Sequence, residues 1–202
     1  MARKPNEKQR NDKREMIIEK AREVFCHKGY LSVTMKDIVD ACGISRGGLY
    51  LFFSSVEELF QAVITTRNMR RFQTVRKQVE MNAEFFGLFD MYFNMQKDRI
   101  LHMENSILRA TYEYYFVHQS PSDIEFRNSQ IVCIKKTILD ILNLGVRQES
   151  ITNDNIDEIA ETYMFLIEGM SVFGMLYNIS EAYIDTQIQL MKNMLTIKTK
   201  GE

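Results

Sequence analysis

Apolar residues return every three or four positions along most of the chain, which is the spacing of amphipathic helices. Between residues 10 and 28, Ile17, Ala21, Val24 and Phe25 fall on one face of such a helix. The same spacing predicts helices over 35–42, 46–52, 57–79, 121–147, 156–178 and 180–197, and two more between 83 and 118 that break near Lys97 and Asp98. We therefore predict an all-α chain of about nine helices.

Residues 34–53 carry the signals of two short helices joined by a tight turn. Thr34 and Asp37 approximate a capping box at the first helix start. Gly43 ends that helix by allowing a positive φ, and Ser45 caps the next one. The buried face of the first helix is expected to be Ile38, Val39, Ala41 and Cys42. Two helices joined in this way form a helix-turn-helix, and the 10–28 helix completes a three-helix domain.

The second of these helices begins with Arg46, Gly47 and Gly48. Each glycine inside a helix costs roughly 1 kcal/mol relative to alanine. Two interpretations are open. In the first, a nucleic-acid backbone comes close to this helix start, where phosphate is favoured. In the second, another helix of the same chain packs tightly there.

Residues 24–60 resemble the DNA-binding domain of the tetracycline-repressor (TetR) family of bacterial regulators, and the detailed match covers roughly the first third of the chain. The matching residues are Phe25, Gly29, Tyr30, Thr34 to Ile38, Ala41 to Tyr50, Phe53, Ser55 and Glu57 to Phe60. The resemblance implies an N-terminal arm and DNA-binding domain over 1–55 and a helical effector-binding and dimerisation domain over 56–202. It implies a homodimer formed through the last two helices, bound to a palindromic double-stranded DNA operator.

The resemblance also implies which residues lie at or near DNA: Thr34, Ser45, Arg46, Gly47, Gly48, Tyr50 and Phe52. Arg46 is the best candidate for reading a guanine edge, because its guanidinium can donate two parallel hydrogen bonds. Thr34 and Tyr50 suit phosphate contacts. Two positions depart from the family pattern. Phe52 replaces a common His or Tyr, and Val56 replaces a common Lys, so one usual phosphate contact is missing.

Charge is divided unevenly along the chain. Residues 1–79 carry sixteen Lys and Arg against nine Asp and Glu, whereas the remainder carries ten against eighteen. A basic end that coincides with the helix-turn-helix favours a polyanionic partner. Arg3, Lys4, Lys8, Arg10, Lys13 and Arg14 form a basic arm, either a DNA contact or a solvated tail. Arg67, Arg70, Arg71, Arg76 and Lys77 are interpreted as a solvated basic face.

Bulky aromatic and methionine side chains are concentrated between residues 83 and 118. Two interpretations stay open: they fill a bundle core, or they enclose a small, apolar or aromatic effector. The candidate pocket residues are Phe89, Tyr92, Phe93, Met103, Tyr112, Tyr115, Phe116 and Phe165. Glu104, Glu113, His102 and His118 are possible polar groups, and a buried Glu beside aromatic rings would suit a lipophilic cation.

Other functional classes find little support. The chain has three histidines, His27, His102 and His118, and they are scattered along the sequence. We therefore expect no catalytic set, no metal site and no cofactor. An enzyme with a helical fold is the least favoured alternative. We expect Cys26, Cys42 and Cys133 to behave as small buried apolar residues. No apolar run reaches the length of a membrane span and no secretion signal is evident, so we expect a cytoplasmic protein.

These observations predict a sequence-specific DNA-binding transcriptional regulator, a repressor that a small ligand releases from its operator. The alternatives are an activator, or a dimeric DNA-binding regulator that needs no ligand.

Overall fold

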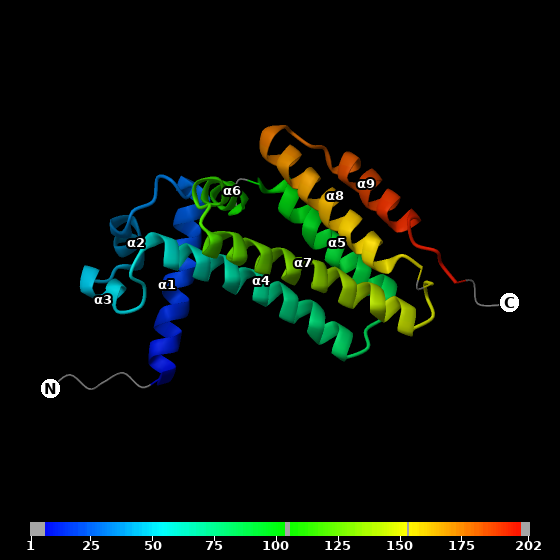
Figure 1. Ribbon diagram of the computed structural model, residues 1–202, viewed down its shortest axis with the longest axis horizontal. Helices are drawn as coiled ribbons and strands as arrows, with labels where there is room; N and C mark the ends of the chain where they lie inside the picture. The colour runs from blue at the N-terminus through cyan, green and yellow to red at the C-terminus, as the bar shows by residue number, and fades with distance from the viewer. Residues whose placement is uncertain (1–6, 104–105, 153, 199–202) are drawn as a thin grey trace. The chain divides into compact units, whose positions relative to one another are not determined.

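The computed structural model describes residues 7–103, 106–152 and 154–198, which form nine α-helices (Figure 1). Their bounds are α1 Glu7–Lys28, α2 Met35–Cys42, α3 Arg46–Tyr50, α4 Val56–Glu80, α5 Phe85–Leu101, α6 Leu108–Val117, α7 Pro121–Arg147, α8 Ile156–Leu176 and α9 Glu181–Asn193. Within the described ranges the extended pairing is limited to an isolated antiparallel bridge between Ile151 and Ile197. The predicted all-α architecture is confirmed.

Several predicted boundaries differ from the structure. Helix α1 begins at Glu7 rather than at residue 10, and α3 ends at Tyr50 rather than at Phe52. The predicted break at Lys97 and Asp98 is wrong, because α5 continues to Leu101. Lys97 stays helical while its ammonium pairs with Glu181 and Asp185 at 2.8 and 2.6 Å, two carboxylates that the local sequence does not reveal.

The chain divides into two compact units. The N-terminal unit comprises residues 1–67 and 104–124, and the C-terminal unit comprises residues 68–103 and 125–202. Two of the three boundaries fall inside long helices, α4 and α7, and the third falls between α5 and α6. Helix α6 therefore belongs with α1, α2 and α3, although it is distant from them in sequence. The predicted functional division at residue 55 stays a prediction.

Aromatic side chains form the centre of the N-terminal unit. Phe25 and Tyr30 contact Phe60 of α4 with ring centroids 4.8 and 4.9 Å apart, and Tyr114 of α6 lies 5.1 Å from both Tyr30 and Phe60. Tyr114 is fully buried, and its hydroxyl accepts a hydrogen bond from the Gln61 amide at 2.7 Å. These contacts fix α6 onto the start of α4 and the end of α1.

A second link to α6 forms at the turn after α1. Gly29 has a φ of +78°, and its neighbours Tyr30 and Leu31 donate backbone hydrogen bonds to the Glu113 carboxylate at 2.6 and 3.0 Å. A Cβ atom at Gly29 would lie 2.5 Å from that carboxylate. Glycine suits this position because a positive φ strains a residue with a side chain, and a Cβ atom would also displace the Glu113 carboxylate.

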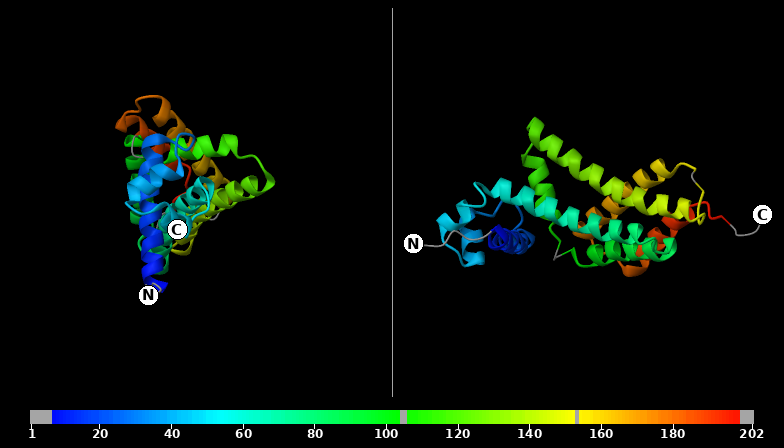
Figure 2. Two further views of the ribbon diagram at one scale, coloured as in Figure 1. Left: turned by 90° about the vertical axis from the view of Figure 1, so that its left-hand side faces the viewer. Right: turned by 90° about the horizontal axis from the view of Figure 1, so that it is seen from below.

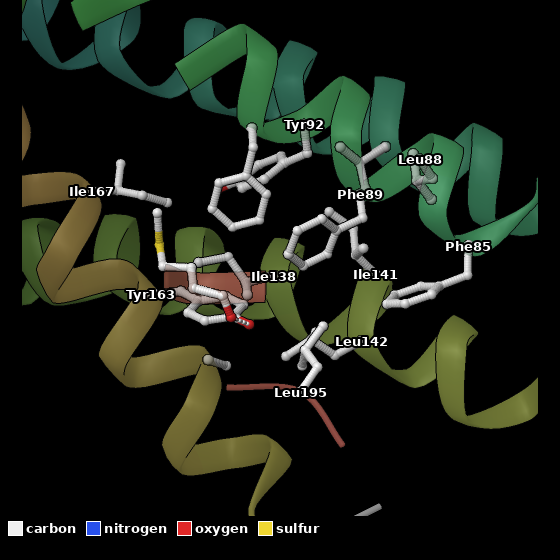
Figure 3. Close-up of a cluster of buried hydrophobic side chains, with 14 of the residues drawn as sticks. Phe85, Leu88, Phe89, Tyr92, Ile138, Ile141, Leu142, Tyr163, Ile167 and Leu195 are labelled. Carbon is white, nitrogen blue, oxygen red and sulfur yellow. Dashed lines mark hydrogen bonds between the residues drawn. The ribbon is translucent and has the colours of Figure 1, made fainter. Parts of the chain in front are cut away.

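The C-terminal unit has an apolar core to which α4, α5, α7, α8 and α9 all contribute. Helix α5 lies beside both α8 and α9 (Figures 1 and 2). Figure 3 shows Phe89 and Tyr163 at the centre of the cluster, with Ile138, Ile141 and Leu142 of α7 around them. The Tyr163 hydroxyl donates to the backbone carbonyl of Met191 at 2.5 Å, which satisfies its buried polar group.

Helix α8 keeps a large apolar surface exposed. Phe165, Phe173 and Leu176 are 70%, 57% and 67% exposed, and a Cβ atom at Gly169 would meet nothing within 4 Å. By length and composition alone, α8 is also the one described helix that could cross a membrane, with 28% of its most apolar segment buried. A helix with an apolar face that another protein chain covers gives the same signal.

Candidate nucleic-acid interface

Helix α2 is held at its start by the predicted capping box. The Thr34 hydroxyl oxygen accepts a hydrogen bond from the Asp37 backbone at 3.3 Å, and the Asp37 carboxylate accepts one from the Thr34 backbone at 2.8 Å. The Lys28 ammonium lies 2.5 Å from the same carboxylate. The bond from Lys28, followed by those from Thr34, holds the pKa of Asp37 well below its usual range.

The capping box changes what Thr34 can offer to DNA. Its hydroxyl also donates to Asp37 at 2.7 Å, and a hydroxyl group carries one proton. The residue is exposed, but that proton is already used. A phosphate contact by the Thr34 hydroxyl would require this bond to break.

The turn between α2 and α3 follows the predicted pattern. Gly43 adopts the left-handed conformation with φ +62°, and the Ser45 hydroxyl oxygen accepts a hydrogen bond from the Gly48 backbone at 3.1 Å. Leu49 and Phe53 are buried at 0% and 1% exposure, so they anchor α3 from the inside. Ile38 is buried, whereas Ala41 is exposed and does not belong to the buried face predicted for α2.

The outward side of α3 carries most of the predicted DNA-contacting residues. Ser45, Arg46, Gly47 and Tyr50 are exposed, and Gly48 and Phe52 are half-buried. The Arg46 guanidinium lies 5.6 Å from the centre of the Tyr50 ring, a cation–π distance that favours a defined position for the arginine. A Cβ atom at Gly47 would meet nothing within 4 Å. Packing within the N-terminal unit therefore gives no reason for glycine at this position.

Basic residues of α1 lie next to the end of α3. Lys8, Arg10, Lys13 and Arg14 belong to α1 and are exposed, whereas Arg3 and Lys4 lie outside the described residues. The Lys13 ammonium lies 6.0 Å from the centre of the Phe52 ring, and the Arg14 guanidinium 5.1 Å from that of Phe53. Part of the predicted arm is thus a helical extension of the basic surface around α3.

The N-terminal unit also holds a polar cluster that sequence reasoning missed. Glu57, His118 and Asp123 offer ligand atoms within 4.8 Å of one another and are the described residues that could hold a metal ion. The His118 Nδ1 atom lies 3.8 Å from Glu57 and 3.7 Å from Asp123. Both Asp123 oxygens already accept hydrogen bonds, one from Tyr114 and one from Ser120. We interpret the cluster as a polar network in which hydrogen bonds hold Asp123 and His118, and Glu57 lies within ion-pair distance of His118. Residue spacing could not reveal it.

The eight predicted pocket residues are divided between the two units. Phe89, Tyr92 and Phe93 are buried together in the core of the C-terminal unit, Met103 packs against that core, and Phe165 is exposed. Tyr112, Tyr115 and Phe116 belong to the N-terminal unit. Phe89 and Phe93 lie 4.4 Å apart and both contact the Tyr163 ring. The rings near the centre thus serve as core.

The polar groups expected around a cationic effector form other contacts in the structure or are exposed. Glu113 accepts the backbone bonds of Tyr30 and Leu31, His118 belongs to the network above, and His102 is exposed beside Asp98. Glu104 lies outside the described residues.

The prediction that Arg71 belongs to a solvated basic face is corrected by the structure. Burial lowers the pKa of its guanidinium to about 10, which would not happen to an arginine surrounded by solvent. The half-buried cysteines likewise have thiol pKa values raised by burial.

A three-helix domain with an exposed, glycine-bearing second helix of a helix-turn-helix defines a class, the helix-turn-helix regulatory proteins. The sequence profile described as "Bacterial regulatory proteins, tetR family" matches residues 17–63. Residues 17–63 thus match the tetR family of bacterial regulatory proteins, which confirms the resemblance seen in this part of the sequence.

Curated relatives and solved structures agree with this assignment. The chain is 33% identical over 108 residues to the uncharacterised HTH-type transcriptional regulator YfiR of Bacillus subtilis, covering 53% of this chain and 52% of YfiR. It is 28% identical over 140 residues to the HTH-type transcriptional repressor KstR2 of Mycobacterium tuberculosis, covering 68% of each. The aligned part thus spans about half the length of YfiR. The reduced form of Escherichia coli NemR shares the fold, with a TM-score of 0.77 at 13% identity over 93% of this chain and all of NemR.

Proposed function

We propose that the protein is a cytoplasmic, sequence-specific DNA-binding transcriptional regulator that acts as a homodimer. The observation that carries this proposal is the open space at Gly47. A glycine that costs helix stability, and that no contact within its own unit requires, is accounted for by a partner whose backbone approaches α3 closely.

Each exposed residue around α3 has a chemical role in this proposal. Arg46, positioned by the Tyr50 ring, reads a guanine edge in the major groove. The Tyr50 hydroxyl and the basic side chains of Lys13 and Arg14 contact phosphates and set the register on the duplex. Thr34 acts mainly through its cap, which keeps α2 in place beneath α3.

The exposed face of α8 supports the dimer. Phe165, Gly169 and Phe173 follow one another at intervals of four residues, so they lie on one face of the helix, and Leu176 extends it. Tyr183 and Leu190 of α9 are also exposed. A twofold contact through this face would pair two recognition helices with half-sites roughly 34–36 Å apart.

We further propose repression that a small ligand relieves. The similarity to KstR2, which is named a repressor, supports the sign of regulation. The bonds from Tyr30 and Leu31 to Glu113 supply a route by which a shift of α6 would move the turn before α2. A ligand that favours one position of α6 then changes DNA affinity by shifting populations. The alternative is a regulator that needs no ligand.

The test is footprinting of the full chain on the DNA upstream of its own gene at two salt concentrations. Wild type is expected to protect a two-part symmetric site. Gly47→Ala is expected to weaken this binding by tenfold or more while leaving the melting temperature equal or higher, because alanine favours the helix. Arg46→Ala is expected to lose site preference, a cost of roughly 1–3 kcal/mol.

Arg76→Ala is the matched control, since Arg76 is an exposed arginine of the C-terminal unit that pairs with Glu80. It should bind the site like wild type. Equal protection by wild type and Gly47→Ala would contradict the close approach to α3, and diffuse protection by all four proteins would contradict sequence-specific binding at this DNA.

A further inference from the structure

The polar network of the N-terminal unit brings together three side chains that commonly bind metal ions. Glu57 lies in the first turn of α4, His118 follows the last residue of α6, and Asp123 lies in the first turn of α7. One donor atom of each side chain lies within 4.8 Å of the other two. The fold thus places two carboxylates and an imidazole around one point.

The distances in this network suit a shared ion better than direct bonds. The His118 Nδ1 atom lies 3.8 Å from the Glu57 carboxylate and 3.7 Å from the Asp123 carboxylate. A hydrogen bond from nitrogen to oxygen normally measures roughly 2.7–3.2 Å, so both separations are too long for one. Ligand atoms that each lie about 2.0–2.2 Å from one metal ion are roughly 3–4 Å from each other.

The orientation of the His118 ring is fixed by two tyrosines. The Nε2 atom lies 2.8 Å from the Tyr30 hydroxyl, and the ring is stacked on Tyr114 with the centroids 4.3 Å apart. When Nε2 carries the ring proton, the Tyr30 oxygen accepts it and Nδ1 presents its lone pair to the carboxylates. Histidines that bind metal ions are usually held in this way, by a hydrogen bond from the second ring nitrogen.

Asp123 is held equally firmly. Its side chain is buried, and one of its oxygens accepts hydrogen bonds from the Ser120 backbone and hydroxyl at 2.9 and 2.6 Å. These bonds hold the pKa of Asp123 below its ordinary value, so the group is ionised. The oxygen that faces His118 accepts one bond, from Tyr114 at 3.2 Å. Since a carboxylate oxygen has two lone pairs, it can bind an ion and keep that bond.

Negative charge in the network lacks a basic partner. Among the described residues, no lysine or arginine lies within ion-pair distance of Glu57 or Asp123, which pair with His118 alone. A protonated His118 would balance one of the two carboxylate charges, whereas a divalent ion would balance both. The Glu57 side chain is 45% exposed. It gives the ion a path from solvent and leaves room for water among its ligands.

We propose that Glu57, His118 and Asp123 bind a divalent transition-metal ion, with water in the remaining coordination positions. An imidazole nitrogen favours Zn²⁺ and neighbouring transition metals, whereas Mg²⁺ is bound through oxygen atoms. The site replaces the expectation of no metal site, which rested on the scattered histidines. It uses only one of them, and the packing of the helices supplies the two carboxylates.

The position of the ion gives it an effect on DNA binding, a step that rests on the proposed function. The ion joins the end of α6 to the start of α4. Glu113 of α6 holds the turn before α2 through Tyr30 and Leu31, and a shift of α6 is the proposed route of DNA release. An ion that restrains α6 opposes this shift, so we expect it to tighten operator binding.

The test is calorimetric titration of the full chain, freed of metal with a chelator, with ZnCl₂ and MgCl₂. We expect one Zn²⁺ per chain, bound at micromolar concentration or below and at least about 100-fold more tightly than Mg²⁺. Glu57→Gln and His118→Phe should each weaken Zn²⁺ binding at least about tenfold, because each removes a ligand. Glu158→Gln is the matched control, since Glu158 is an exposed glutamate in the first turn of α8.

A second measurement keeps the test valid if His118→Phe folds poorly. Glu57→Gln keeps the shape of a half-exposed side chain, and Co²⁺ reports its ligands through its visible absorption spectrum. Wild type is expected to change the spectrum of added Co²⁺, and Glu57→Gln is expected to change it less. Unchanged Zn²⁺ affinity in Glu57→Gln, or in a folded His118→Phe, would place the ion elsewhere and overturn the site. No Zn²⁺ binding at millimolar concentration would overturn it as well.

The effect on DNA is tested separately by repeating the footprint with Zn²⁺ and with a chelator. Tighter binding with Zn²⁺ in wild type, but not in Glu57→Gln, would support both proposals. Zn²⁺ binding without any change in the footprint would leave the metal site standing and contradict its link to α3. Diffuse protection under both conditions would contradict the proposed function at this DNA and leave the calorimetric result standing.

Discussion

The exposed surface around α3, with Ser45, Arg46 and Tyr50, and the buried core of the C-terminal unit are held together in opposite ways. On the surface the deciding bonds join residues three apart, Thr34 with Asp37 and Ser45 with Gly48. In the core, the buried Tyr163 hydroxyl of α8 donates a hydrogen bond to the Met191 carbonyl of α9, and these residues are 28 positions apart. The first region is exposed, and bonds between residues close in sequence fix its geometry. The second region is buried, and its contacts form only when the helices of the bundle have packed together. Local arrangements can be predicted from residue order, and assembled ones need the fold.

The largest loss of unfolding free energy should come from Gly29→Ala. This variant compares a glycine whose Cβ position is already occupied with Gly47, where the Cβ position is empty. The positive φ of Gly29 costs a side chain about 1–2 kcal/mol, and displacing Glu113 loses charged hydrogen bonds of about 1.5–3 kcal/mol. We expect a loss of about 3 kcal/mol in unfolding free energy, measured by urea denaturation. Gly47→Ala is the control. Similar curves for both variants would contradict the contrast between the two glycines.

A smaller loss is expected when either helix cap is removed. Thr34→Ala and Ser45→Ala should each cost about 1 kcal/mol of unfolding free energy, because each leaves a backbone N–H without its partner. Urea denaturation measures both. Ser122→Ala, at an exposed hydroxyl outside these caps, is the control. Stability unchanged in Thr34→Ala would show that Asp37 holds α2 without the threonine.

Acid should weaken the N-terminal unit through its carboxylates. Hydrogen bonds to Lys28 and Thr34 lower the pKa of Asp37, and those to Ser54 lower the pKa of Glu58. A lowered folded-state pKa stabilises above the ordinary value near about 4 and loses that contribution as pH falls toward the folded-state value. Urea midpoints should fall below pH about 4 in wild type and fall less in Asp37→Asn. A parallel fall in both proteins would remove Asp37 from this account.

The smallest effect is expected from Val56→Lys, at the first residue of α4. The new ammonium supplies one more phosphate contact, so DNA binding should tighten and the slope of log affinity against log salt should steepen by about 1. Titrations at several salt concentrations measure that slope. A slope equal to that of wild type would show that residue 56 does not face the phosphates.

Sequence reasoning reached the parts whose causes are local. The caps at Thr34 and Ser45, the turn at Gly43 and the helix order follow from residue types at short spacing. The end of α3 was missed by two residues, because helix ends fray and are poorly defined by residue type. The continuation of α5 was missed because the carboxylates that pair with Lys97 come from α9. Arg71 was misread because four neighbouring basic residues suggested a solvated face, and only the packed bundle separates it from them.

The N-terminal unit has a consequence for the order in which this protein can be made. A ribosome completes the helix-turn-helix long before it reaches Glu113 and Tyr114, the residues that close the turn at Gly29 and the aromatic centre. All of α5, which belongs to the other unit, is synthesised in between. The helix-turn-helix therefore cannot complete its packing until this late segment of the nascent chain has been made. The two units fold in an interleaved order rather than one after the other.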